Sequence, residues 1–120
     1  MTTFSKSVGF ALNGIRCCFT QESHFKIHTL FTISVIAAGF FFKINHVDWL
    51  ILLLCIAAVL AVELINTAIE ELCNIVHKEI HPGIKLVKDM AAGAVLITAI
   101  AAATAGAVIF IPRILSFINK

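Results

Sequence analysis

The sequence contains little charge and no tyrosine. Only 13% of its 120 residues are charged, 60% are hydrophobic, and the mean hydropathy is +1.01. Soluble domains carry charge on about a quarter of their residues. Phenylalanine occurs ten times, mostly at the ends of apolar runs. The shortage of charge excludes an ordinary soluble domain and indicates an integral membrane protein of one domain, residues 1–120.

Other absences narrow the class of protein further. The net charge is only +2, which is too small to indicate a nucleic-acid partner. The four cysteines lack the spacing of a disulfide framework, because Cys17 and Cys18 are adjacent while Cys55 and Cys73 fall within one apolar segment. The N-terminal region lacks the continuous apolar core of a signal peptide, so we expect the chain's own spans to place it in the membrane.

Residues 4–20 form the first predicted element, an amphipathic helix. Apolar residues recur there at helical spacing, and polar residues lie elsewhere around the helix. The pattern is typical of a helix that lies in the membrane interface. A short helix packed on the other spans fits the same pattern.

Three membrane spans are predicted after this helix, over 27–43, 48–76 and 90–111. The second span continues past the membrane, and the third contains no charge and is expected to end before Pro112 and Arg113. Six of the nine cationic residues flank the spans on one side, namely Lys6, Arg16, Lys26, Lys78, Lys85 and Lys88. The positive-inside rule therefore places the N-terminus and the predicted loop 77–89 in the cytoplasm.

The third span is rich in alanine and glycine, which allow helix backbones to approach closely in lipid. Three spans enclose little space of their own. We therefore expect a homo-oligomer that shelters polar groups between subunits.

A line of polar residues follows one face of the second span. Positions with helical spacing place five residues on that face: Glu63, Asn66, Glu70, Asn74 and His77. A carboxylate within a span is costly and marks a functional candidate. The line could instead bond other helices together, conduct ions or protons, or form an active site between a lipid hydroxyl and a magnesium-bound nucleotide.

The predicted loop 77–89 favours the active site, because lysines suit phosphate and carboxylates suit Mg²⁺. A solvated loop is the alternative. Cys73, His77 and His81 have the spacing of metal ligands, although Pro82 makes the third position uncertain. A P-loop is excluded, because Ile15 and Arg16 follow the glycine pair where Lys and Ser or Thr are required.

Two segments carry a resemblance to a known family. "VELINTAIEEL", residues 62–72, and "EIHPGIKLVKDMAAGAVLI", residues 79–97, resemble the prokaryotic diacylglycerol kinase family, which includes undecaprenol kinases. The similarity extends from "FSKSVGFALNGIR", residues 4–16, through the third span. The segments "NTAIE" and "KDMAAGAVL" are closer to the undecaprenol-kinase-like members.

The resemblance implies an all-α homotrimer in the bacterial inner membrane, with a surface helix, three spans and active sites shared between subunits. It implies transfer of the ATP γ-phosphate, with Mg²⁺, to diacylglycerol or undecaprenol at the cytoplasmic face. Glu63 resembles the catalytic base, and Glu22 and Glu70 resemble the magnesium ligands.

Further roles follow from the same resemblance. The implied ATP-binding residues are Phe10, Glu22, Asn66, Glu70, Glu79, Ile80, His81, Lys88 and Asp89, and the implied lipid-binding residues are Arg16, Glu63 and Ala92. The sequence departs from some members at Phe10 (Tyr), His28 (Glu) and Asn74 (Asp). The alternative function is a non-enzymatic channel or structural subunit with a polar helix face.

Overall fold

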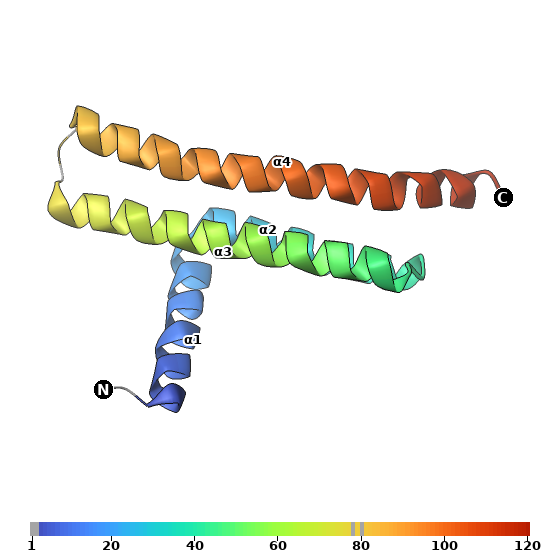
Figure 1. The fold of residues 1–120 in the computed structure, drawn as a ribbon, viewed down its shortest axis with the longest axis horizontal. Helices are drawn as coiled ribbons and strands as arrows, with labels where there is room; N and C mark the ends of the chain where they lie inside the picture. The colour runs from blue at the N-terminus through green and yellow to red at the C-terminus, as the bar shows by residue number, and fades with distance from the viewer. Residues whose placement is uncertain (1–2, 78, 80) are drawn as a thin grey trace.

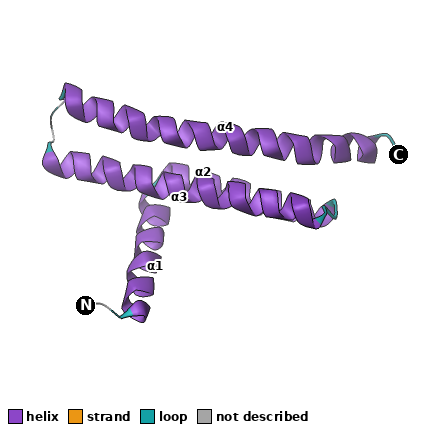
Figure 2. Ribbon diagram, viewed as in Figure 1, coloured by secondary structure: helices purple, strands orange, loops and turns teal. Residues whose placement is uncertain are grey.

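The fold is built from helices alone in the described part of the chain (Figure 2). The computed structural model describes residues 3–77, 79 and 81–120. Within them lie α1 (Phe4–Gln21), α2 (Ser23–Phe41), α3 (His46–Val76) and α4 (Pro82–Ile118). The last three are long and apolar enough to cross a membrane. The prediction of a short helix followed by three spans is therefore confirmed.

The first helix points away from the other three (Figure 1). Thr3 caps its first turn by accepting a hydrogen bond from the backbone N–H of Lys6. Glu22 ends it in an extended conformation and is also the residue before α2 begins, so the chain changes direction there. Cys18 is the one buried residue of α1. An exposed amphipathic helix that runs across the spans fits the interface position better than a helix packed along them.

A tight connection joins α2 to α3. Lys43 adopts a left-handed conformation with φ of 53°, and the Asn45 side chain caps α3 at the backbone N–H of Asp48. A methyl group added to Gly39 would lie 2.7 Å from the Trp49 ring. Glycine at this position therefore allows α2 and α3 to approach closely.

The hydrophobic core lies at one end of the bundle, which we call the distal end. It consists of Ile44, Leu52, Ile109 and Phe110. Aromatic rings pack around it, and the ring centroid of Phe42, the residue that caps α2, lies 6.2 Å from that of Phe110 on α4. The polar line of α3 lies toward the other end.

The third span extends beyond the range that the sequence predicted, at both ends. Residues 82–89, expected to be loop, form the start of α4, because Pro82 favours the first helical turn and His81 accepts from the N–H of Gly83. The expected end before Pro112 is also wrong, since α4 continues to Ile118. A proline inside a helix costs about 3 kcal/mol, and tertiary contacts of Arg113 at the next position offset that cost.

Arg113 makes those contacts in two directions. Its guanidinium donates to the backbone carbonyl of Ile109 and, at 2.7 Å, to the carboxylate of Asp48 on α3. The ion pair and the aromatic packing hold the last turns of α4 against α3. The distal end of the bundle is therefore fixed by contacts that are complete within the chain.

Candidate active site

Among the residues that the structure describes, two polar side chains are buried, and both come from α3. Glu63 is 3% exposed and Asn66 is 9% exposed. They lie three positions apart and so share one face of the helix. About 20 residues cross the hydrocarbon core, so a span that begins at Trp49 ends near Ala68. Both side chains thus lie just inside the membrane, where a carboxylate is costly and indicates function.

The Glu63 carboxylate meets an imidazole from α2. The His28 Nε2 atom lies 3.5 Å from the Glu63 Oε2 atom. Buried charges in proteins are generally paired, and a protonated imidazole would compensate this carboxylate. The contact places a second titratable group beside Glu63.

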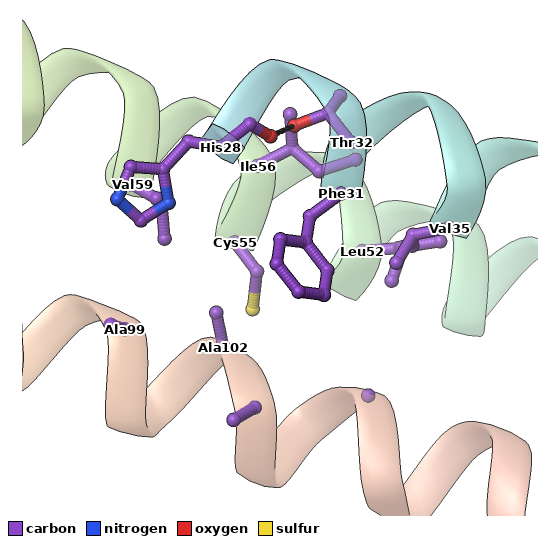
Figure 3. Close-up of a pocket in the computed structure, with 12 residues that line it drawn as sticks. His28, Phe31, Thr32, Val35, Leu52, Cys55, Ile56, Val59, Ala99 and Ala102 are labelled. Carbon is purple, nitrogen blue, oxygen red and sulfur yellow. Dashed lines mark hydrogen bonds between the residues drawn. The ribbon is translucent and has the colours of Figure 1, made fainter. Parts of the chain in front are cut away.

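A cavity of about 320 Å³ lies beside His28, between α2, α3 and α4. Figure 3 shows His28 at one end, with Phe31 and Cys55 pointing into the space and Ala102 on the opposite helix. Its wall is almost entirely apolar. Small residues on α4 leave the space open, and an apolar chain fits its chemistry.

A thiol and a hydroxyl connect α1 to this site. The Cys18 thiol donates to the Thr67 hydroxyl at 3.7 Å, and that hydroxyl donates to the Glu63 backbone carbonyl at 3.0 Å. Burial raises the pKa of the Cys18 thiol, the hydrogen bond with Thr67 opposes this, and the Glu22 and Glu63 carboxylates raise the pKa further. Both carboxylates therefore raise the pKa of the same neutral thiol, so Glu22 lies near the site.

Glu22 and Glu70 are the carboxylates that could hold magnesium. Both are half-buried, and each lies one helical turn beyond the contact between Cys18 and Thr67. Mg²⁺ usually takes one or two protein carboxylates together with substrate phosphates. In residues 3–77, 79 and 81–120, no group of three or more His, Cys, Asp or Glu side chains could hold a metal. The two carboxylates fit an ion that is shared with a nucleotide.

The side chain of Asn66 has an unsatisfied hydrogen-bond acceptor, which indicates a site that a ligand completes. Its Oδ1 atom is enclosed and accepts no hydrogen bond from the residues that the structure describes. A buried acceptor of this kind is rare without a water, an ion or a ligand to satisfy it. The side chain therefore awaits a donor on the same face of α3 as Glu63.

The alternative metal site at Cys73, His77 and His81 is not formed. The two imidazole centroids lie 5.3 Å apart, but both Nδ1 atoms are engaged by the backbone. The His77 Nδ1 lies 2.9 Å from the carbonyl oxygen of Glu79, and the His81 Nδ1 accepts from Gly83. These contacts shape the connection between α3 and α4.

Lysines gather where α4 begins. The Lys88 ammonium donates to the Asn74 side-chain oxygen on α3 at 2.8 Å. A neutral amide holds this ammonium without neutralising it, so its charge remains for a phosphate. Asp89 is engaged differently, because it accepts from Lys85 at 2.6 Å on the exposed face of α4.

Several predicted site residues lie on the outside of the single chain. Phe10 is 66% exposed, and Arg16, Glu79 and Ala92 are exposed as well. Ile80 lies outside the described residues. The chain by itself therefore brings Glu63, Asn66 and Glu22 together and leaves Phe10, Arg16, Glu79 and Ala92 on its surface.

Sequence reasoning missed three contributors to the site. His28 was noted only as a departure from other members, and Cys18 and Thr67 received no role. A titratable residue inside the first predicted span was the available signal for His28. Nothing in the sequence indicated the contact between Cys18 and Thr67, which depends on how α1 meets α3.

Comparisons with known proteins identify the family of the chain. A sequence profile of the family described as prokaryotic diacylglycerol kinase matches residues 9–110. The chain is 33% identical over 114 residues to the undecaprenol kinase of Bacillus subtilis, which covers 95% of this chain and 93% of that protein. It is 26% identical over 101 residues to the diacylglycerol kinase of Escherichia coli (strain K12), covering 84% and 83%.

A longer relative also matches most of the chain. The chain is 35% identical over 111 residues to the diacylglycerol kinase of Synechocystis sp., which covers 92% of this chain and 63% of that protein. The matches include α2, α3 and most of α4, which carry the buried carboxylate and its surroundings. The chain belongs to the prokaryotic diacylglycerol kinase family and is a membrane lipid kinase.

Proposed function

We propose that the protein transfers the γ-phosphate of ATP to the hydroxyl group of diacylglycerol or undecaprenol, at the cytoplasmic face of the bacterial inner membrane. The observation that carries this proposal is the buried Glu63 carboxylate in contact with His28, a residue that lines an apolar cavity. A lipid substrate can reach that position from the bilayer. The relatives named undecaprenol kinase and diacylglycerol kinase support both acceptors.

Glu63 acts as the general base. The lipid hydroxyl oxygen bonds to the γ-phosphorus, the bond from that phosphorus to the ADP oxygen breaks, and the hydroxyl proton passes to Glu63. Burial excludes water that would compete with the lipid hydroxyl. The lipid chain lies in the apolar cavity beside His28.

The nucleotide binds on the water-exposed side of Glu63. Glu22 and Glu70 would hold the magnesium ion, which neutralises charge on the phosphates when it is bound. Asn66 orients a donor in the site, and Lys88 pairs with phosphate. Glu79, Ile80, His81 and Asp89, near the α3–α4 connection, complete the nucleotide site together with Phe10.

A homotrimer completes the active site between subunits. The exposed positions of Arg16 and Ala92 in the single chain support this arrangement, as does the small-residue surface of α4. Lipid-binding groups that lie outside one chain would face the carboxylates of a neighbour. The excess of cationic residues near α1 and the start of α4 supports the cytoplasmic orientation.

Replacement of the base tests the proposal. Glu63→Gln keeps the shape of the side chain and removes proton acceptance, so we expect kcat to fall by about 10²–10⁴. Nucleotide affinity and the folded oligomer should remain. Glu71→Gln, which removes an exposed carboxylate from the same helix, is the control and should keep its activity. Unchanged turnover in Glu63→Gln would exclude the role of base.

A further inference from the structure

The contact between His28 and Glu63 has no part in the phosphate transfer proposed above. The imidazole comes from α2 and the carboxylate from α3, and their nearest atoms lie 3.5 Å apart. Glu63 is among the most buried residues of the chain, with 3% exposure. An ionised carboxylate in such a place requires a charged or hydrogen-bonding partner. His28 is positioned to be that partner.

No other basic side chain competes for this place in the described residues. The ion pairs there are His28–Glu63, Lys85–Asp89 and Arg113–Asp48, so only the imidazole lies within ion-pairing distance of Glu63. Lys88, the basic residue near the same end of α3, donates to Asn74 instead. The charge balance of the buried carboxylate therefore depends on whether His28 carries a proton.

The other titratable groups on the elements around the pair form no ion pair with Glu63; on α2, the helix that carries His28, they are the exposed His24 and Lys26. From α1, its junction with α2, and α3, these groups are Cys18, Glu22, Cys55 and Glu70. Burial, reinforced by the nearby carboxylates, raises the pKa of the Cys18 thiol, so this thiol stays neutral. On α4, the residues that line the cavity beside His28 are alanines and a glycine, none of which titrates.

We propose that His28 is a positioning residue for Glu63, a role that rests on the proposed function. The protonated imidazole pairs with the carboxylate, keeps it ionised and aims it at the end of the cavity where the lipid hydroxyl arrives. His28 passes no proton in the transfer itself, because the hydroxyl proton goes to Glu63. Imidazole changes its charge between about pH 5 and 8, so the pair couples turnover to pH in that range.

The pH dependence of one rate ratio tests this role. His28→Gln keeps a polar side chain of similar reach and removes the charge. We expect the ratio of wild-type to His28→Gln kcat to be about tenfold near pH 6 and to fall toward unity near pH 8.5, as the imidazole loses its proton. His24→Gln is the matched control, because His24 is an exposed histidine one turn earlier on α2. Its ratio should not change with pH.

A merely structural role for His28 gives a different result. Loss of packing would lower kcat by the same factor at every pH, so a constant ratio would overturn the proposal. A ratio that rises with pH would overturn it as well, since the neutral imidazole would then be the active form.

Nitrogen NMR of ¹⁵N-histidine-labelled protein in micelles tests the pair without any turnover. Near pH 7 the imidazolium fraction of His28 should be smaller in Glu63→Gln than in the wild type, with His24 unchanged. Equal fractions would overturn the pair. If the wild-type protein transfers no phosphate to lipid, the proposed function fails and the catalytic role of His28 fails with it. The nitrogen signals then still decide whether the two side chains interact.

Discussion

Each end of the α3–α4 pair holds a carboxylate, and the two carboxylates have different partners. At the distal end, Asp48 accepts from Arg113 at 2.7 Å, and the hydrophobic core packs beside this ion pair. At the other end, Glu63 is more deeply buried, yet its nearest basic side chain is an imidazole at 3.5 Å. The neighbouring Asn66 oxygen has no partner in the described residues.

The difference separates a charge that stabilises the fold from one that serves a reaction. The Asp48 carboxylate has a close arginine partner from α4, and this pair fixes the contact between α3 and α4. Glu63 has an imidazole as its basic neighbour and lies near an unsatisfied amide oxygen, so a ligand can still add partners at this end. The polar end of this bundle is therefore the reactive end, and the distal end is structural.

After Glu63→Gln, the largest effect is expected from the magnesium ligands. Glu70→Gln replaces a charged carboxylate ligand of the metal with a neutral amide. The KM for magnesium-bound ATP should therefore rise by at least about tenfold, while the KM for the lipid stays the same. Initial rates at varied ATP and at varied lipid measure the two constants separately. Glu71→Gln, at the adjacent exposed position, is the control. An unaltered nucleotide KM in Glu70→Gln would remove Glu70 from the metal site.

A smaller effect, on the lipid side, is expected from filling the cavity. Ala102→Phe places a ring in the space beside His28, and we expect the KM for the lipid to rise by about tenfold without a change in the KM for ATP. Ala101→Phe adds the same ring to an exposed position of α4 and should leave both constants near the wild-type values. Equal effects of the two variants on lipid KM would show that the cavity does not hold the lipid chain.

The smallest kinetic effect is expected at the distal end. Asp48→Asn weakens the ion pair with Arg113 and should cost about 2 kcal/mol of folding free energy, which lowers the melting temperature by several degrees. The kcat of the folded protein should not change. Asp89→Asn breaks the exposed Lys85–Asp89 pair and should alter the melting temperature little. A large loss of kcat in Asp48→Asn would remove the distinction between the two ends.

Local sequence patterns determine most of the fold. Uncharged runs and the amphipathic pattern of residues 4–20 predicted four helices close to those observed, because both signals depend on neighbouring residues. The end of the last helix was mispredicted. Proline ordinarily stops a helix, and the continuation is explained by tertiary contacts, namely Arg113 with Asp48, 65 positions away, and the packing of Phe117 on Phe41 and Phe42.

In the candidate site, too, one part follows from spacing along a single helix and another part depends on how the helices pack. Helical spacing alone predicts that Glu63 and Asn66 share one face of α3, and both side chains are buried. The partners of Glu63 come from other helices. The His28 imidazole and the contact between Cys18 and Thr67 depend on how α1 and α2 pack on α3, which spacing along one helix does not specify.

Transfer of labelled phosphate from γ-labelled ATP is the most direct test of the central claim. Purified wild-type protein is supplied with Mg²⁺ and with diacylglycerol or undecaprenol in separate samples of the same detergent micelles. The account predicts label in the lipid extract with at least one acceptor, and a strong preference would identify the physiological one. No label in either lipid, from folded protein with Mg²⁺ present, would contradict the assignment of this site to lipid phosphorylation.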